Sequence, residues 1–202
     1  MKSSTAPNTE ARRCGWCGTD PLYIAYHDSE WGVPSFDDAH LFEMLILEGQ
    51  QAGLSWLTIL KKRAALREAL AGFDPQRLAR FTAADIERLL DNPGIVRNRA
   101  KLQAAVTNAR AFLELAAHEG GFAPFLWSFV EGRPVQNRFR RLVDIPTQTT
   151  VSRRLARALK QRGFQFVGPT MCYAYMQAVG LVNDHLVSCP RHEEVASLAP
   201  DI

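Results

Sequence analysis

The 202-residue sequence lacks any long apolar segment. No run of hydrophobic residues reaches the roughly 20 that a helix needs to cross a bilayer, which argues against a membrane-spanning protein. The first twelve residues are polar and contain no apolar core of the kind found in secretory signal peptides. We therefore expect a cytoplasmic protein without membrane contact, with a disordered leader over residues 1–12.

Alternation of apolar and polar residues, the pattern of half-buried strands, is nearly absent, and we find neither internal repeats nor low-complexity segments. Apolar residues at helical spacing follow capping residues such as Ser55 and Thr82. The sequence predicts an all-α fold with one helical domain over residues 13–189, made of one or two lobes, and a flexible tail over residues 190–202. The expected helices cover residues 37–50, 56–70, 83–91, about 95–118, 152–162 and 169–181, with a short helical turn at residues 74–75.

The excess of positive charge is small, with 24 Lys and Arg against 21 Asp and Glu and a formal net charge of +3. Such an excess does not by itself indicate nucleic-acid binding. A basic patch remains compatible with the sequence, because basic residues gather in four segments: 61–63, 97–101, 138–141 and 153–162.

Cysteine is scarce, and the four cysteines of a cytoplasmic protein are more often thiols or metal ligands than disulfides. The four-residue spacing of His185 and Cys189 places both side chains on one face of a helical turn. Two more ligands from the N-terminal segment would complete a tetrahedral, and therefore structural, zinc site. Spacing alone does not separate this site from ordinary thiols and histidines. The residues concerned are Cys14, Cys17, His27, His185, Cys189 and His192.

Residues 89–97 predict two helices joined by a tight hairpin at residues 92–94. In DNA-binding hairpins a glycine such as Gly94 lets the backbone approach a phosphate, which the first N–H groups of the next helix bind. Many helical hairpins share these features without binding DNA, and Val96 stands where the usual DNA-binding hairpin has a second glycine. Positive charge beside the hairpin would come from Arg97, Arg99 and Lys101.

Glu48 follows an almost wholly apolar stretch, Leu41 to Leu47. Its carboxylate is either buried, which is rare without a partner, or marks the point where the helix end reaches solvent. Two glycines, Gly49 and Gly53, bracket the polar residues that follow, and this turn would expose Leu54 as an apolar wedge into a base stack. The nearby aromatic residues are typical of a core, and also of a platform for a flat cationic ring: Trp16, Tyr23, Tyr26 and Trp31.

Eight ordered motifs extend the evidence from about residue 13 to residue 189. They read RCGW at 13–16, DPLYIAYHD at 20–28, EWGVP at 30–34, LFEM at 41–44, LEGQQAGLSW at 47–56, WSF at 127–129, KQRGF at 160–164 and GLVNDH at 180–185. Together they closely resemble the bacterial DNA-3-methyladenine glycosylase I family.

The resemblance implies a helix-hairpin-helix glycosylase that acts as a monomer on double-stranded DNA. It would hydrolyse the N-glycosidic bond of 3-methyladenine, after base flipping, without cutting the strand. Glu48 is implied as the catalytic residue that contacts the methylated base, and Leu54 as the residue that fills the gap in the duplex. The implied base-binding residues are Tyr26, Trp56, Trp16 and Gln51. The hairpin pattern described above predicts DNA contacts at Gly94, Arg97, Arg99 and Lys101. The implied ligands of one structural zinc ion are Cys14, His27, His185 and Cys189, with Cys17 as a bystander.

The sequence has no Asp between Asp91 and Asp144, where many hairpin-containing glycosylases carry a catalytic Asp. The family shares this absence. Methylation at N3 makes the adenine cationic, which weakens its bond to the sugar because the base leaves as a neutral molecule. Such a substrate needs little acid–base catalysis. The other classes to weigh are a zinc-stabilised DNA-binding module without activity, an inactive relative, and a zinc hydrolase, which would need an open metal position.

Overall fold

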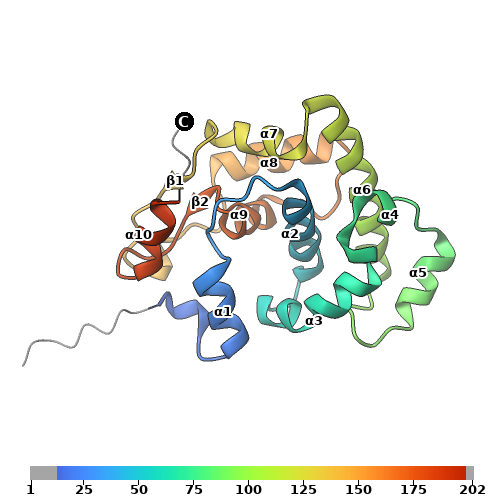
Figure 1. Cartoon of the computed structure of the whole chain (residues 1–202), viewed down its shortest axis with the longest axis horizontal. Helices are drawn as coiled ribbons and strands as arrows, with labels where there is room; N and C mark the ends of the chain where they lie inside the picture. The colour runs from blue at the N-terminus through green and yellow to red at the C-terminus, as the bar shows by residue number, and fades with distance from the viewer. Residues whose placement is uncertain (1–12, 199–202) are drawn as a thin grey trace, which may run out of the picture.

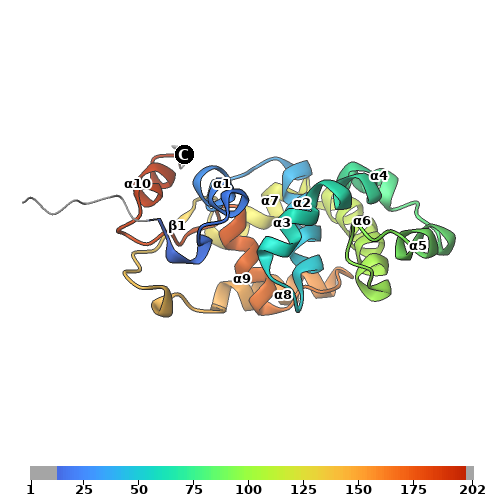
Figure 2. The same cartoon turned by 90° about the horizontal axis from the view of Figure 1, so that it is seen from below.

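The computed structural model describes residues 13–198. Its central helices are α2 (Asp38–Gln51) and α9 (Pro169–Ala178), which pack against each other (Figure 1). One end of the molecule holds α4 (Pro75–Leu78), α5 (Ala83–Leu90) and α6 (Arg99–Glu119), while α3 (Trp56–Ala69) packs against α1 and α2 nearer the centre (Figure 1). The other end holds α1 (Pro21–Ser29) and α10 (Pro190–Ala196), so that segments far apart in the sequence lie side by side (Figure 2).

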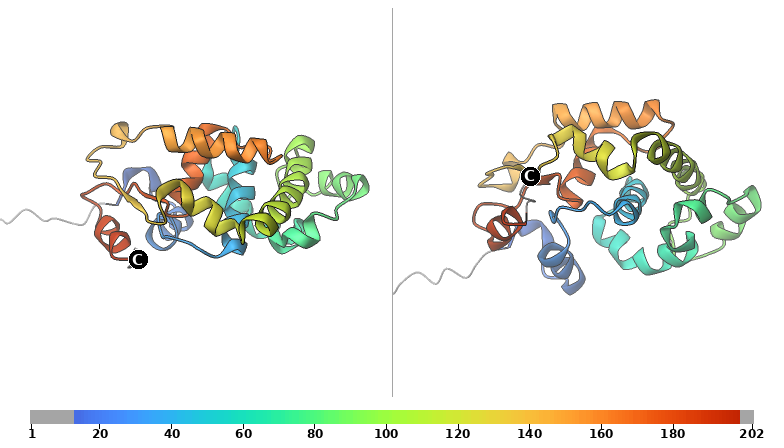
Figure 3. Two further views of the ribbon diagram at one scale, coloured as in Figure 1. Left: turned by 90° about the horizontal axis from the view of Figure 1, so that it is seen from above. Right: turned by 45° about the horizontal axis from the view of Figure 1, so that its top comes forward.

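The remaining helices lie along one side of this arrangement. Helices α7 (Phe122–Trp127) and α8 (Thr150–Gln161) run over α2 and α9 (Figure 3). Four short 3-10 helices complete the helical elements of the described residues: η1 (Gly15–Cys17), η2 (Ala71–Phe73), η3 (Ser128–Val130) and η4 (Leu142–Asp144). Within residues 13–198, none of the helices combines the length and the apolarity that crossing a membrane takes.

Helix α2 forms the centre of the core. Every residue from Leu41 to Gln50 is buried, and α3, α6, α7 and α9 pack around the helix. Each large apolar side chain that leaves water here stabilises the fold by roughly 1.5–3 kcal/mol. The Tyr175 hydroxyl of α9 donates to the Leu41 carbonyl at 2.9 Å, which fixes the two helices relative to each other. The apolar sequence of this segment is therefore the signature of a fully buried helix.

Capping residues set the helix starts that the sequence predicts. The Ser55 side chain accepts from the backbone N–H of Thr58, and Thr82 and Asp85 form a reciprocal capping box. The long helix starts at Arg99, later than predicted, because the Asn98 side chain accepts from the third residue of the helix and its own backbone is extended.

The last predicted helix ends at Ala178, before residue 181, because the chain must turn sharply at Gly180. Gly180 has a φ of +76°, and a Cβ there would lie 2.4 Å from the backbone nitrogen of Pro34. Only glycine fits so close an approach at this backbone angle.

The tail predicted over residues 190–202 is wrong for its described part, because residues 190–196 form α10. Val195 is fully buried, and the His192 carbonyl accepts from the Asn183 amide at 2.9 Å. Burial of an apolar side chain and a long-range hydrogen bond hold this segment on the domain. The predicted leader, residues 1–12, and residues 199–202 lie outside the described residues.

Two short strands depart from the all-α expectation. Strands β1 (Val135–Gln136) and β2 (Val182–Asn183) pair in parallel, with Val135 opposite Val182. Beyond the strands, the Val187 N–H donates to the Phe139 carbonyl at 3.0 Å. The pairing therefore holds the chain on both sides of His185, a predicted metal ligand.

Candidate functional site

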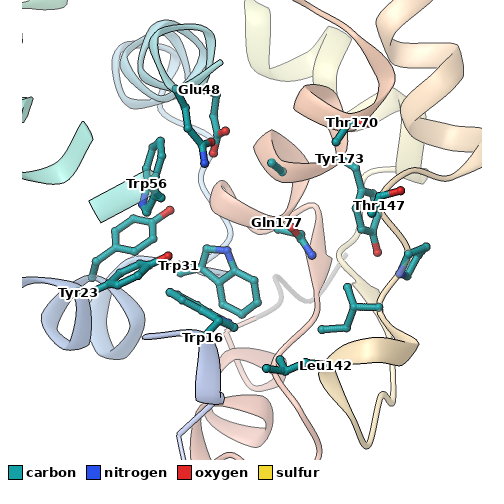
Figure 4. Close-up of a pocket in the computed structure, with 15 residues that line it drawn as sticks. Trp16, Tyr23, Trp31, Glu48, Trp56, Leu142, Thr147, Thr170, Tyr173 and Gln177 are labelled. Atoms are coloured by element: carbon teal, nitrogen blue, oxygen red, sulfur yellow. The ribbon is translucent and has the colours of Figure 1, made fainter. Parts of the chain in front are cut away.

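A pocket of about 400 Å³ opens between α1, α2, α3, α9 and the loop after η4. Its volume is in the range of small-molecule binding sites. Figure 4 shows tryptophan and tyrosine side chains on one wall, beside Glu48, and a mixture of polar and apolar side chains on the opposite wall, among them Leu142, Thr147, Thr170 and Tyr173. The lining residues are Trp16, Tyr23, Tyr26, Trp31, Glu48, Gln51, Trp56, Leu142, Ile145, Pro146, Thr147, Thr170, Tyr173, Ala174 and Gln177.

The aromatic wall brings together three of the predicted base-binding residues. The ring centroids of Tyr26 and Trp56 are 5.4 Å apart, and those of Trp16 and Tyr23 are 5.0 Å apart. The indole N–H groups of Trp16 and Trp56 are buried and make no hydrogen bond with a described residue. Buried indole N–H groups usually have a partner, so this wall offers two unused donors to a ligand with flat, polar edges.

Helix α1, which carries Tyr23 and Tyr26, is fixed by a half-buried ion-pair cluster. Arg63 of α3 donates to Glu30 at the end of α1 at 2.7 Å and to Glu43 of α2 at 2.8 Å. Arg67 pairs with the same Glu43. One guanidinium thus bridges three segments and holds the aromatic wall against α2.

Glu48 lies in the last turn of α2 and reaches the pocket. It is only 5% exposed, so the alternative of a solvent-exposed helix end is wrong. Its Oε2 atom is buried and makes no hydrogen bond with a described residue. Burial raises the pKa of Glu48 to about 8, because an unpaired carboxylate loses its hydration. The site therefore holds an acidic group that a cation would drive toward its ionised form.

Lys101 has a structural role, so the prediction that its side chain contacts DNA is wrong. The side chain is buried, and its ammonium donates to the carbonyls of Gln50 at 2.8 Å and Ala52 at 2.6 Å. Those carbonyls belong to the end of α2, where a helix lacks intrahelical donors. The charge thus stabilises the helix end next to Glu48 and does not face solvent as a phosphate ligand must.

The turn after α2 has the exposed apolar residue that the sequence predicts. Gly53 has a φ of +78°, and the Leu54 N–H donates to the Gln51 carbonyl at 2.6 Å. This tight turn leaves Leu54 40% exposed, while the side chain of Gln51 lines the pocket. The pocket and the exposed leucine are therefore next to each other along the chain.

The wall opposite the aromatic wall contains residues for which sequence reasoning assigned no role. Gln177 and Tyr173 of α9 line the pocket, and both donate to buried Asp184, at 2.8 Å and 2.6 Å respectively. Asn137, next to β1, donates to the other oxygen of the carboxylate at 2.6 Å. The four-residue spacing of Tyr173 and Gln177 along one helix was the available signal, but their shared acceptor lies on another element.

The predicted metal ligands meet in one buried cluster. Their nitrogen and sulfur atoms all lie within 4.8 Å of one another: Cys14, His27, His185 and Cys189. The Sγ of Cys14 is 3.6 Å from the His185 ring, and the Sγ of Cys189 is 3.6 Å from the His27 ring. Zinc with bonds of about 2.3 Å to sulfur and about 2.0 Å to nitrogen needs tetrahedral S···N edges of about 3.6 Å. The cluster therefore fits a zinc ion.

The surroundings of the cluster fix both imidazole rings. Asp28 contacts the outer nitrogen of His27 at 2.7 Å, and the Trp31 carbonyl contacts that of His185 at 3.0 Å. Partners of this kind orient metal-ligating histidines. The chain between the two ligands forms a turn, in which the Cys189 N–H donates to the Leu186 carbonyl at 2.8 Å. The predicted helical turn is therefore wrong, although the spacing does bring His185 and Cys189 together. The Cys17 thiol donates to the Cys14 carbonyl at 3.1 Å and lies outside the cluster.

Residues 16–192 match a family model described as methyladenine glycosylase. The chain belongs to the methyladenine glycosylase family. A relative, DNA-3-methyladenine glycosylase 1 of Escherichia coli strain K12, is 54% identical over 177 residues, which cover 88% of this chain and 95% of that protein. The predicted family is thus confirmed.

Solved structures of methyladenine glycosylases share the fold. A crystal structure of 3-methyladenine DNA glycosylase I matches with a TM-score of 0.87 and 56% identity, covering 89% of this chain and 98% of that one. A variant of 3-methyladenine DNA glycosylase I in complex with 3-methyladenine matches with a TM-score of 0.86 and 43% identity, covering 88% and 95%.

In this methyladenine glycosylase family member, internal contacts already use much of the hairpin. The Gly94 N–H donates to the Asn92 side chain at 2.8 Å, and the Gly94 carbonyl accepts from Lys62 at 3.0 Å. Arg97 is exposed, and Arg99 pairs with Glu87 at an N–O distance of 2.7 Å across two exposed side chains. A surface pair of this kind is weak, so DNA contacts at Gly94, Arg97 and Arg99 stay predictions.

Proposed function

We propose that the protein excises 3-methyladenine from alkylated DNA by hydrolysing the bond between the base and deoxyribose. The observation that carries the proposal is the buried, unpaired carboxyl group of Glu48 on the wall of an aromatic pocket. Family membership and the relative that holds 3-methyladenine support the same substrate.

The charge of the substrate explains the selectivity of such a site. N3 methylation gives the adenine a positive charge, which interacts with the faces of Tyr26 and Trp56 and with ionised Glu48. A neutral adenine gains no such attraction. When a neutral base occupies the pocket, Glu48 stays protonated, because burial raises its pKa to about 8. The pocket therefore favours the cation over the normal base.

The reaction needs the base outside the helix stack. Unstacking costs a few kcal/mol, less for a damaged pair, and Leu54 is exposed beside the pocket to fill the vacated space. The bond between C1′ and N9 then breaks, its electron pair goes to the base, and the base leaves neutral. Water adds to C1′ and releases a proton, which leaves an abasic site.

The proposed enzyme does not cut the strand. A lyase step needs an amine nucleophile at the sugar, and no lysine is among the described residues that line the pocket. We further propose that the protein works on double-stranded DNA as a cytoplasmic monomer.

Zinc is proposed as a structural ion. Cys14, His27, His185 and Cys189 would hold it, and four protein ligands leave no coordination position for a substrate. When bound, the ion ties the first described residues to the last helix, and it supplies no catalytic chemistry.

The direct test is incubation with methylated DNA, followed by chromatography of the released bases. The wild-type protein should release 3-methyladenine, and Glu48→Gln should release it at least about 100-fold more slowly, as expected for a lost charge contact in a buried site. The matched control is Glu68→Gln, at an exposed position of α3, which should behave as the wild type. Release of 3-methyladenine at the wild-type rate by Glu48→Gln would refute the assigned role.

A further inference from the structure

Helix α8 lies in a stretch of the chain that carries only positive charge. No Asp or Glu occurs between Asp144 and Asp184, and the basic residues of this stretch all lie in α8 or directly after it. They are Arg153, Arg154, Arg157, Lys160 and Arg162. The formal net charge of the whole chain is only +3, so α8 is far more basic than the protein as a whole. A helix with this charge attracts a polyanion.

Contacts within the fold use two of these basic residues. The Arg162 guanidinium pairs with Glu119 at 2.8 Å and lies 4.7 Å from the ring centroid of Phe125 in α7. The Arg154 guanidinium lies 5.8 Å from the ring centroid of Phe129 in η3. Both arginines therefore lie on the flank of α8 that faces α7 and η3.

The other three basic residues form an exposed stripe along α8. Arg153, Arg157 and Lys160 follow the i, i+4 and i+7 spacing that puts side chains on one face of a helix. None of the three has an ion-pair partner among the described residues, and the Arg153 guanidinium donates to neutral Thr150 at 3.2 Å. Burial raises the pKa of the Cys172 thiol to about 12, and the positive charge of Lys160 opposes this shift. The stripe therefore lies toward α9, which carries Cys172.

The stripe lies on the side of the molecule where the proposed function puts the duplex. Figure 2 shows α8, the turn between α2 and α3 and the start of α6 along one side, with α4 and α10 on the opposite side. Beyond α8, Phe166 lines a small cavity together with Gln50 of α2 and Lys101 of α6. Figure 1 shows α2 between α8 and α3. The stripe and the hairpin at residues 92–94 therefore flank the turn of Leu54 from opposite sides.

A phosphate backbone fits this stripe in charge and in spacing. Seven residues of helix rise about 10 Å, and one DNA strand carries a phosphate about every 3.4 Å along its axis, so the stripe spans about three phosphates. The stripe has no apolar side chain that would enter a membrane surface or the core of a protein interface. We propose that Arg153, Arg157 and Lys160 bind the phosphate backbone of the duplex on the side of the lesion away from the hairpin.

These contacts position the duplex and carry no sequence information. With the predicted hairpin contacts on one flank and the stripe on the other, the backbone is held on both sides of the damaged base. Leu54 lies between the two anchors, where the base leaves the stack.

The proposal rests on the proposed function, and the test separates the two. Affinity for a duplex with a stable abasic-site analogue is measured over a range of salt concentrations, for wild type and for Arg153→Gln/Arg157→Gln. The magnitude of the slope of log affinity against log salt should fall by about 2 in the variant, about one for each lost phosphate contact. The matched control, Arg77→Gln/Arg80→Gln, removes the same charge in and just after α4, on the opposite side of the molecule (Figure 2). It should keep the wild-type slope.

Shortening the duplex identifies the flank that the stripe contacts. Cutting the duplex back close to the analogue on one side should make wild type and Arg153→Gln/Arg157→Gln equal, and cutting back the other side should leave their difference intact. A difference that survives both cuts would overturn the inference, because the charges would then act without a contact on either flank.

Equal slopes of wild type and Arg153→Gln/Arg157→Gln on the full duplex, or the same fall in the control, would also overturn the inference. Lys160→Gln, with a slope lower by about 1, provides the second variant if the double variant does not fold. The test measures binding alone. Absence of 3-methyladenine release by the wild type would therefore refute the proposed function, while the slopes would still decide whether the stripe binds DNA.

Discussion

Lys101 and Gln50 hold each other through two reciprocal hydrogen bonds. The Lys101 ammonium donates to the Gln50 carbonyl at 2.8 Å, and the Gln50 side-chain amide donates to the Lys101 carbonyl at 3.2 Å. This contact joins the start of α6 to the end of α2, two residues beyond Glu48. Burial lowers the pKa of Lys101, in keeping with an ammonium removed from solvent.

Replacing Lys101 by methionine should therefore lower the stability of the fold. The carbonyls of Gln50 and Ala52 would lose a charged donor, which costs about 2 kcal/mol of the free energy of unfolding. Urea denaturation measures this loss, with Lys160→Met at an exposed site of α8 as the control.

Salt dependence of DNA binding separates this role from a phosphate contact. Loss of one phosphate contact lowers the slope of log affinity against log salt by about 1. Lys101→Met should leave that slope unchanged. A lower slope with unchanged stability would show that the ammonium binds DNA after all.

The fold was predictable wherever local chemistry decides it. Ser55 and Thr82 cap their helices, and the apolar run before Glu48 is buried, since these features depend on neighbouring residues. The role of Lys101 was not predictable, because it depends on carbonyls about fifty residues away that only packing of α2 on α6 brings close.

The candidate site likewise contains residues whose roles could be predicted from the sequence and residues whose roles could not. The buried cysteine–histidine cluster was predictable through the resemblance of its motifs to the family, because the spacing of these residues alone does not separate metal ligands from ordinary thiols and histidines. The Gln177–Asp184 contact was not, because glutamine and aspartate occur on most surfaces and only the turn at Gly180 places them side by side.

Glu48 should make stability depend on pH. Its pKa is raised from 4.5 to about 8 in the folded protein, so its stabilising contribution is complete below pH 4.5 and is lost as the pH rises toward 8. Glu48→Gln lacks this loss and should be more stable than wild type by about 1–3 kcal/mol at neutral pH. Urea denaturation at several pH values measures the difference, which should vanish in acid. Equal stability at neutral pH would mean that the carboxyl is hydrated or paired.

The cluster of cysteines and histidines predicts that substitution of Cys14 lowers zinc content and stability, whereas substitution of Cys17 does not. Cys14→Ser should reduce bound zinc and lower the melting temperature by about 10 °C, because the ion joins distant segments. Cys17→Ser is the matched control, since that thiol lies outside the cluster. Zinc content by atomic absorption decides the point. Full zinc stoichiometry in Cys14→Ser would contradict the assigned ligand set.

Leu54 should matter only where a duplex has to be opened. Leu54→Ala should slow single-turnover excision from duplex DNA about tenfold, or about 1.4 kcal/mol, because the smaller side chain no longer fills the gap. Excision from single-stranded DNA should change little. Leu198→Ala, at a leucine that is 51% exposed, is the control. An equal loss on both substrates would assign Leu54 to the fold.

The central claim is that a buried acidic group holds an already cationic base. The most direct test is the single-turnover rate of 3-methyladenine release across the pKa of about 8 of Glu48, for wild type and Glu48→Gln on the same DNA. With enzyme in excess of DNA but below saturation, the wild-type rate should rise with pH and level off above that pKa, because only ionised Glu48 attracts the cation. Glu48→Gln should be slow and independent of pH. A wild-type rate that is flat, or a Glu48→Gln rate that rises in the same way, would contradict the claim.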